Sequence, residues 1–401
     1  MTLSNSYRRP EFDTLFRRLE EEPRHAIQVV YGPRQVGKST LMAQIAEASR
    51  KITHLASADA VPAADASWIR VQWDQLRMRL AAEPGASGIL ILDEIQKISN
   101  WSEQVKKEWD ADTLARRPIH VVLLGSSRVW LQKGLGESLA GRFEATYLGH
   151  WSYPEMRDAF GFTPEQHVWF GGYPGAVPFI DDEPRWKAYI RDSLIDSSIQ
   201  RDVLMLTPIQ KPALMRRLFD LGTAYSGQMV SYTKLMGQLQ DAGNTTTLAH
   251  YLEALDSAGL LAGIEKYSPD KLRQRASSPK FQVHNMALMS AGEAMGFSEV
   301  RNRPERWGRW VESAVGAHLL NFARRTRSEL FYWRDGDDEV DFILLNKGRV
   351  TAIEVKSGDR QSPGGLSAFA KRHHADRLIL VGQGGLPWQT FLQMDPADVA
   401  G

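Results

Sequence analysis

A glycine-rich loop is the strongest chemical signal in the sequence. Residues 32–39, Gly-Pro-Arg-Gln-Val-Gly-Lys-Ser, match the pattern G-x-x-x-x-G-K-[ST] in full, between a predicted strand at Ala26–Tyr31 and a predicted helix at Ser39–Ala48. The backbone amides of such a loop surround phosphate oxygens, and the amino terminus of the helix adds positive potential. We therefore expect Lys38 to reach the β- and γ-phosphates of a nucleotide, and Ser39 to be a ligand of Mg²⁺. The residues predicted to bind the nucleotide are Gly32, Pro33, Arg34, Gln35, Val36, Gly37, Lys38, Ser39 and Thr40.

Two carboxylates follow the apolar run Ile89–Leu92, which is predicted to be a buried strand. Acids at the end of a buried strand are unfavourable unless they are paired or lie near a metal. Without the loop, this pair would be interpreted as a turn. Because the chain has the loop, we predict that Asp93 holds the metal, through its bound water, and that Glu94 is the base that polarises the attacking water.

Two further positions are candidates for a part in hydrolysis. The apolar run Val121–Leu124 is followed by a glycine and two serines, Ser126 and Ser127, and a serine there can orient the lytic water or sense the γ-phosphate. A helix cap is the alternative for these serines. Arg142 precedes the predicted strand Ala145–Leu148, where it could act as an arginine finger in a neighbouring subunit. A surface ion pair is the alternative for Arg142.

Composition excludes several classes of protein. The 401 residues include no cysteine, so disulfides, thiolate nucleophiles and cysteine-ligated zinc are excluded. No apolar stretch approaches the ~20 residues of a membrane span, and the first residues lack the apolar segment of a secretory signal. We therefore expect a soluble, cytoplasmic protein without a membrane partner. The net charge is +1, so any DNA binding must come from local clusters, which could equally be solvated helix faces. The candidates are Arg301, Arg303, Arg306, Arg309, Arg324, Arg325 and Arg327.

The order of predicted elements indicates an α/β fold class and four domains. Residues 1–160 alternate strands and helices, as in a doubly wound domain. A helical linker or lid is predicted over residues 161–210, with one helix at Arg185–Leu206. Residues 211–290 have the order helix, helix, helix, hairpin, which is typical of a winged helix. Residues 291–401 are predicted to form a small α/β domain.

The third helix of the predicted winged helix is poorly suited to reading DNA. This helix, Thr245–Ala258, contains no lysine or arginine but does contain Glu253 and Asp256. Phosphate neutralisation, the main source of affinity for DNA, is therefore missing there. We expect any DNA contact to be non-specific and to involve the predicted wing, or the helix that carries Arg324. A purely structural role for the winged helix is the alternative. The polar and basic candidates are Thr245, Thr246, Thr247, His250, Lys266, Lys271, Arg273 and Arg275.

Four residues near the carboxyl terminus form a second candidate site. Glu312 lies on a predicted helix, Asp341 on a strand, and Glu354 and Lys356 two residues apart on the next strand. If the strands are neighbours, three carboxylates and a lysine can converge, as metal-assisted cleavage of a phosphodiester requires. The order resembles the PD-(D/E)xK nuclease fold. Salt bridges and an edge strand decorated with charges are the alternatives.

Taken in order, these motifs resemble an AAA-type ATPase of the AAA+ superfamily. The resemblance includes the loop, the Leu-Asp-Glu and Gly-Ser-Ser strand ends, and Ser-Leu-Ala-Gly-Arg-Phe at residues 138–143. With Trp-Ser-Tyr-Pro-Glu at 151–155 and Gly-Gly-Tyr-Pro at 171–174, the chain is similar over nearly its whole length to a family of predicted prokaryotic ATPases that carry a carboxyl-terminal domain of unknown function. The resemblance implies that ATP is the nucleotide. No second sensor arginine is clear, and Arg201 is the one candidate.

Three functions are compatible with this sequence. The first is a Mg²⁺-dependent ATPase that acts on DNA as an oligomeric machine for remodelling, translocation or branch migration. An arginine finger needs a head-to-tail homo-oligomer, such as a hexameric ring. The second is an ATP-dependent switch that acts on a protein partner. The third is a nuclease gated by ATP.

Overall fold

Two compact units make up the chain. The computed structural model describes residues 7–61, 65–126, 138–204, 209–239, 244–268, 277–356 and 364–400. The amino-terminal unit lies within residues 4–148, and the carboxyl-terminal unit begins at Gly149. This division is coarser than the four predicted domains, whose limits remain predictions.

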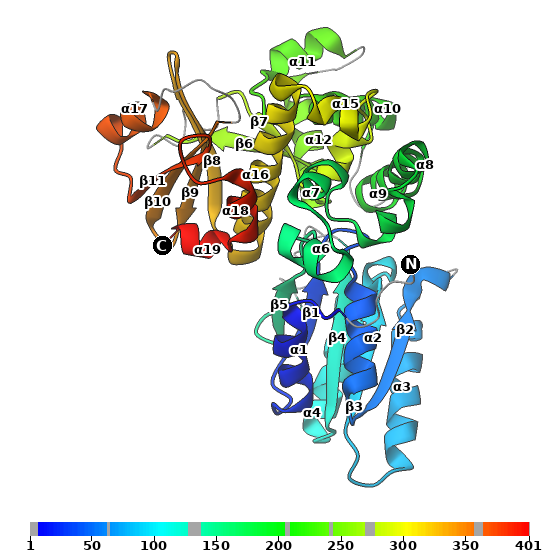
Figure 1. Ribbon diagram of the computed structural model, residues 1–401. Coiled ribbons are helices and arrows are strands. Elements are labelled where there is room, and N and C mark those ends of the chain that lie inside the picture. The colour runs from blue at the N-terminus through cyan, green and yellow to red at the C-terminus, as the bar shows by residue number, and fades with distance from the viewer. Residues whose placement is uncertain are drawn as a thin grey trace. The chain divides into compact units, whose positions relative to one another are not determined.

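A parallel sheet forms the centre of the amino-terminal unit (Figure 1). Its strand order is β2-β3-β4-β1-β5, and every pairing is parallel. The central strands are apolar and buried, as their composition predicts. The edge strand β2 was not anticipated, because it is only partly buried and mixes polar with apolar residues. The strands are β1 (Ile27–Tyr31), β2 (Ile52–Ser57), β3 (Gly88–Asp93), β4 (Ile119–Gly125) and β5 (Phe143–Tyr147).

Helices cover both faces of this sheet. Phe12 and Met42 represent one apolar cluster, in which α1 and α2 pack on the strands. Trp73 and Trp109 represent the cluster on the other face, formed with α3 and α4. Two 3₁₀ turns, at Ala58–Ala60 and Ile95–Lys97, follow β2 and β3. The helices are α1 (Glu11–Glu20), α2 (Lys38–Ala48), α3 (Ser67–Ala81) and α4 (Trp101–Leu114).

The carboxyl-terminal unit begins with short helices. Gly171 ends α7 with φ 66°, and a Cβ on Gly172 would lie 2.1 Å from the carbonyl oxygen of Trp151, so this turn requires glycine. The single helix predicted at Arg185–Leu206 is wrong in detail, because the backbone passes through two π-helical segments. The elements are α6 (Tyr153–Phe160), α7 (Pro164–Phe170), a 3₁₀ segment (Pro174–Phe179), α8 (Glu183–Ala188), a π-helix (Tyr189–Ile195), α9 (Asp196–Ser198) and a second π-helix (Ile199–Leu204).

Three helices and a hairpin come next, in the order that the sequence predicts. Strands β6 and β7 pair antiparallel, with Leu261 opposite Val283. An isolated bridge joins Met229, between α10 and α11, to Lys280. The assignment of a winged helix remains a prediction. The elements are α10 (Pro212–Ala224), α11 (Tyr232–Gln238), α12 (Thr245–Ser257), β6 (Leu261–Lys266) and β7 (Lys280–Val283).

A six-stranded sheet joins this hairpin to the rest of the unit. Its order is β11-β10-β9-β8-β6-β7, and β6 pairs with β8 in parallel. The predicted winged-helix and nuclease-like regions therefore share one sheet. The remaining elements are α14 (Met286–Ser290), α15 (Phe297–Arg301), α16 (Pro304–Thr326), β8 (Glu329–Asp335), β9 (Asp338–Asn346), β10 (Arg349–Lys356), α17 (Gly364–Arg372), β11 (Arg377–Gly382), α18 (Trp388–Gln393) and α19 (Pro396–Ala400).

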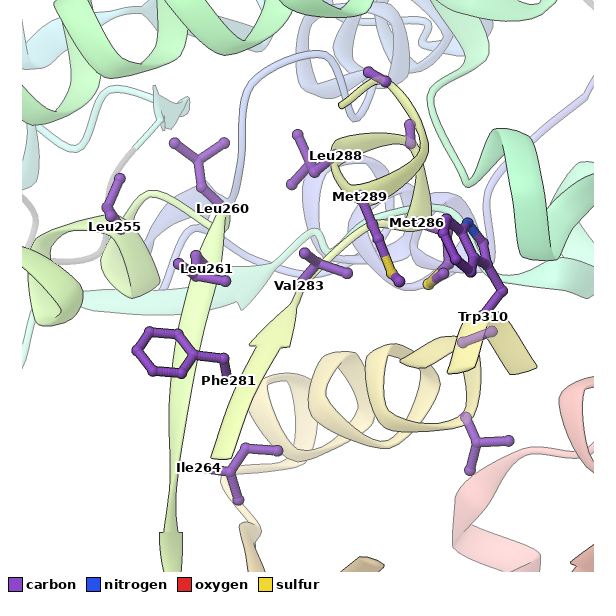
Figure 2. Packing of buried hydrophobic residues seen from close by; sticks show 14 of the residues in the cluster. Leu255, Leu260, Leu261, Ile264, Phe281, Val283, Met286, Leu288, Met289 and Trp310 are labelled. Carbon is purple, nitrogen blue, oxygen red and sulfur yellow. The ribbon is translucent and has the colours of Figure 1, made fainter. Parts of the chain in front are cut away.

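The largest apolar cluster lies in this unit and includes both predicted regions. Figure 2 shows Phe281 on β7 close to Leu261 on β6, and Met286 and Met289 extending toward Trp310 on α16. The Trp310 indole nitrogen donates to the Ser290 hydroxyl at 2.9 Å, so this buried polar atom is satisfied. Within the described residues, no helix combines the length and the apolar character that crossing a membrane requires.

Candidate functional site

The predicted phosphate loop adopts a strained, glycine-dependent turn between β1 and α2. Gly37 has φ 91° and Gln35 has φ 63°, both in the left-handed region. A Cβ on Gly32 would lie 1.9 Å from the carbonyl oxygen of Leu148. The Lys38 ammonium donates to the carbonyl oxygens of Gly32 and Pro33, at 2.8 Å each. The loop therefore curls around the ammonium group at the start of α2.

Arg9 supports this loop from outside the motif. Its guanidinium Nη1 donates to the carbonyl oxygen of Val36 at 3.1 Å, and its Nε lies 3.7 Å from a Glu11 carboxylate oxygen. The Arg9 side chain is buried. Sequence reasoning missed it, because nothing in the local sequence connects an arginine before α1 to a loop about 27 residues later.

Ser39 and Asp93 meet at the carboxyl edge of the sheet. The Ser39 hydroxyl donates to Asp93 Oδ2 at 2.7 Å, and the backbone amide of Glu94 donates to Asp93 Oδ1 at 2.8 Å. Asp93 is the last residue of β3, and Ser39 follows the loop after β1, so both lie at the carboxyl ends of parallel strands, where ligands bind in such sheets. The hydroxyl and carboxylate oxygens are the donors that Mg²⁺ prefers, so this pair fits the predicted metal.

Glu94 lies buried among polar partners. Its backbone is left-handed, with φ 52°, and its Oε2 accepts from Gln96 Nε2 at 2.7 Å and lies 3.4 Å from Arg34 Nη2. Burial raises the pKa of Glu94, and the positive charges of Arg34 and Lys38 offset only part of that rise. A raised pKa suits a carboxylate that accepts a proton.

Gln96 connects Glu94 to the predicted sensor position. The same Nε2 that donates to Glu94 lies 3.2 Å from the hydroxyl oxygen of Ser126, which follows β4. Ser126, Gln96 and Glu94 are all buried. Sequence reasoning missed Gln96, although its position two residues after Glu94 was a usable signal. Ser127, the second predicted serine, lies outside the described residues.

Arg142 is held within its own subunit in this structure. Its Nε lies 2.9 Å from Asp110 Oδ1, and its Nη2 lies 3.2 Å from Asp110 Oδ2. Its carbonyl oxygen accepts from the amide of Ile27, at the start of β1, whereas the phosphate loop follows the end of β1. The geometry is therefore that of a partly exposed ion pair, and the role as arginine finger remains a prediction.

The four residues of the second candidate site divide into two ion-paired groups, one of which contains an unpredicted lysine. Lys280 Nζ lies 2.8 Å from Glu312 Oε1 and 3.1 Å from Asp341 Oδ1. Lys356 Nζ lies 2.6 Å from Glu354 Oε1. Burial alone would lower the pKa of Lys280, but Asp341 and Glu312 raise it above its ordinary value. Burial raises the pKa of Glu312 to about 7, although Lys280 acts in the opposite direction.

Several arginines predicted as DNA contacts are engaged within the carboxyl-terminal unit. Arg324 pairs with Asp256 on α12, and Asp256 also lies 2.7 Å from His284 Nε2. Arg325 lies 2.9 Å from Asp395. Other members of the set are Arg306, paired with Glu293 at 3.1 Å, and Arg309, which donates to the carbonyl oxygen of Ala224 at 2.7 Å. The predicted wing residues Lys271, Arg273 and Arg275 lie outside the described residues, as does the side chain of Arg201.

Comparison with known families confirms the coarse assignment of the first part of the chain. Residues 24–157 match an AAA domain. This segment, which contains the loop, the acidic pair and Arg142, is therefore similar to AAA domains. Residues 162–298 match a domain of unknown function (DUF8612), and residues 307–388 match another domain of unknown function (DUF4143).

Similarity to known proteins extends over most of the chain but indicates no activity. Two uncharacterized proteins, one from Mycobacterium bovis and one from Mycobacterium tuberculosis, are each 27% identical over 386 residues, which span 94% of this chain and 81% of theirs. A solved structure of the Aeropyrum pernix ORC1 protein in complex with DNA covers 72% of this chain and 92% of its own, at 13% identity. Its TM-score of 0.31 is too low to carry an argument about fold or function.

Proposed function

We propose that this chain is a Mg²⁺-dependent ATPase whose site is the loop of residues 32–39 together with Asp93 and Glu94. The observation that carries the proposal is the 2.7 Å hydrogen bond from the Ser39 hydroxyl to Asp93, next to a lysine that the glycine turn encloses. Loop, hydroxyl and carboxylate are brought together from separate segments as phosphoryl transfer requires. The match to an AAA domain supports the same assignment.

Each side chain has a role that follows from its position. Lys38 and the loop amides bind the phosphates, and Ser39 and Asp93 would hold Mg²⁺, which neutralises phosphate charge when bound. Glu94 accepts the proton of the attacking water. The Gln96 amide fixes the Glu94 carboxylate and ties it to Ser126, so that the base and the sensor respond together.

Arg142 acts in the site of a neighbouring subunit under this proposal. Its pair with Asp110 is partly exposed, so the side chain can leave Asp110 at small energetic expense. A finger supplied in this way requires a head-to-tail assembly, which closes into a ring such as a hexamer or continues as a helix.

For the target of the ATPase, the geometry supports a protein partner better than DNA. Arg324 is engaged with Asp256, and α12 carries no lysine or arginine. Phosphate contacts supply most of the affinity for DNA, so both observations weigh against DNA as the target. An ATP-driven machine on DNA is the second candidate, favoured by the exposed side chains of Arg301 and Arg303.

Steady-state ATP turnover with and without double-stranded DNA tests both parts. We expect Glu94→Gln to retain nucleotide binding and to lose about 10²- to 10⁴-fold in turnover, because the proton acceptor is gone while the binding loop is intact. Binding is measured with a labelled nucleotide on the same samples. Full turnover by Glu94→Gln would refute the role of the base.

The response to DNA separates the two targets. Turnover that DNA leaves unchanged agrees with a switch acting on a protein. Stimulation that is lost in Arg301→Ala/Arg303→Ala, and kept in the matched surface control Arg349→Ala, would establish the DNA machine instead.

A further inference from the structure

Two of the carboxylates predicted for a nuclease-like metal site, Glu312 and Asp341, contact a lysine that the sequence pattern does not include. We infer that the ammonium group of Lys280 takes the place of a divalent cation between Glu312 and Asp341. On this reading, the carboxyl-terminal unit binds no divalent metal at these carboxylates and cleaves no phosphodiester with one.

The Lys280 ammonium uses its hydrogen-bonding capacity on the oxygens that a metal would need. Its Nζ lies 2.8 Å from Glu312 Oε1, 3.1 Å from Asp341 Oδ1 and 3.4 Å from the Asp341 carbonyl oxygen. An ammonium group has three donors and no acceptor, so three oxygens satisfy it. A metal ion bound to the same oxygens would have to displace it, because both positive charges cannot share so small a space.

The lysine cannot easily withdraw from this position. Its side chain is 1% exposed, and its backbone begins β7, opposite Ile264 of β6 and bridged to Met229. Swinging the ammonium away would leave it buried without a counter-charge, or would break the hairpin. The ring of Phe342, 4.7 Å from Nζ, adds a further favourable contact.

The remaining oxygens do not make up a second metal site. Asp341 Oδ2 accepts from the amide of Val355 at 2.8 Å, and Glu354 Oε1 is paired with Lys356. Glu354 Oε2 is buried and has no hydrogen-bond partner among the described residues. Across the described part of the chain, no three acidic or histidine side chains are grouped so that they could hold a metal ion. The residues therefore do not fit the metal that a nuclease-like fold implies.

The same contacts give Lys280 a positive role. It lies on β7, Glu312 lies on α16 and Asp341 lies on β9, so one ammonium group joins three elements of the carboxyl-terminal unit. A metal would join carboxylates in a similar way, but it could be lost or exchanged, whereas the lysine is covalently part of the chain. The group is thus a permanent internal ion cluster.

Manganese binding to the full-length chain tests the inference. Ser39→Ala and Asp93→Asn first remove the ligands predicted at the phosphate loop, and free Mn²⁺ is then measured by electron paramagnetic resonance without nucleotide. We expect no saturable binding up to about 1 mM, the weak end of carboxylate sites. Adding Lys280→Ala is expected to create one saturable site per chain, which Asp341→Asn then removes.

Each outcome has a defined meaning. Mn²⁺ binding to the chain with native Lys280 would overturn the inference if Asp341→Asn abolishes it. Binding that persists in Asp341→Asn occurs elsewhere on the chain and agrees with the inference. A Lys280→Ala chain that retains its circular dichroism and gains no site would also overturn it. If Lys280→Ala fails to fold, the inference is tested by DNA cleavage with the chain that has native Lys280. We expect it to leave labelled DNA intact with Mg²⁺ or Mn²⁺, and cleavage abolished by Glu354→Gln would contradict the inference.

Discussion

Lys38 and Lys280 are both buried lysines set close to carboxylates, but their ammonium groups have different partners. Lys38 is held by two neutral carbonyl oxygens of its own loop, and Lys280 by the carboxylates of Glu312 and Asp341. Carbonyl groups position a charge without cancelling it, which suits the proposed role of Lys38 in binding a phosphate. Carboxylates neutralise the charge, so Lys280 is committed to the protein itself. The partner of the ammonium therefore separates a binding lysine from a structural one.

The largest expected effect is on stability and concerns Lys280. Lys280→Met leaves the partly buried Glu312 and Asp341 without their counter-charge, and removing one partner of a buried ion pair costs about 3 to 5 kcal/mol. We expect the free energy of unfolding, measured in urea, to fall by this amount. The exposed Lys371, on α17, provides the control Lys371→Met, which should change it by less than about 0.5 kcal/mol.

The pH dependence of this loss sharpens the prediction. The pKa of Glu312 is already raised to about 7, and Lys280 holds it down, so the variant raises it further. A carboxyl group with a raised pKa binds its proton more tightly when folded, so its contribution to stability is present at low pH and is lost as pH rises through the folded value. The deficit of Lys280→Met should therefore be larger at pH 8 than at pH 6. A deficit independent of pH would mean that Glu312 is not the group left unpaired.

The second effect concerns Lys38 and should appear in function. Lys38→Met removes the charge that faces the phosphates, and we expect turnover of ATP to fall on the order of 10²- to 10³-fold. Stability should change less than in Lys280→Met, because the lost hydrogen bonds go to neutral carbonyl oxygens rather than to carboxylates. Lys107→Met, on the exposed face of α4, is the matched control. A loss of stability as large as that of Lys280→Met would contradict the distinction between Lys38 and Lys280.

A smaller effect is expected from the amide between Glu94 and Ser126. Gln96→Leu keeps the volume but removes the donor to Glu94, and a hydrogen bond to a charged group is worth about 1.5 to 3 kcal/mol. A water molecule can replace part of this hydrogen-bond energy, so we expect turnover to fall about tenfold with nucleotide affinity nearly unchanged. A change in affinity alone would place Gln96 in binding instead.

The smallest effect is a shift in pH profile. Arg34 lies 3.4 Å from Glu94 and lowers its pKa, in opposition to burial. Arg34→Gln should raise the pKa of Glu94, so that turnover at saturating ATP begins to fail at a higher pH as the solution is acidified. The acidic limb of the pH profile of turnover should therefore move toward neutral pH. A movement toward lower pH would show that a group other than Glu94 controls this limb.

Local motifs were predictable from the sequence, and contacts between distant segments were not. The loop at residues 32–39 is contiguous, so spacing alone predicts its turn and the helix behind it. Asp93 and Glu94 were found because an apolar strand ended in two acids. Lys280 gave no such signal, since its partners lie 32 and 61 positions away and only the three-dimensional arrangement of β7, α16 and β9 brings them together. Sequence reasoning saw the four carboxyl-terminal residues but not the cation among them.

The bounds of helices and strands were likewise predictable only where local sequence sets them. The sequence predicts strands at Leu330–Arg334, Glu339–Asn346 and Val350–Lys356, with a turn at Lys347-Gly348. The bounds of β8, β9 and β10 differ from these by at most one residue at either end. The helix predicted at Arg185–Leu206 instead contains two π-helical segments. π-Helical turns are rare and occur mostly as insertions within α-helices, so a helical pattern in the sequence predicts an α-helix there.

Strand β6 has a consequence for how such a chain can be divided. It pairs with β7 on one side and with β8 on the other, so it is hydrogen-bonded to both of the stretches that match domains of unknown function. Separating the two stretches would expose the unpaired edges of β6 and β8, which can pair with strands of other molecules. We therefore expect a fragment that ends near residue 300 to expose the edge of β6 and to aggregate.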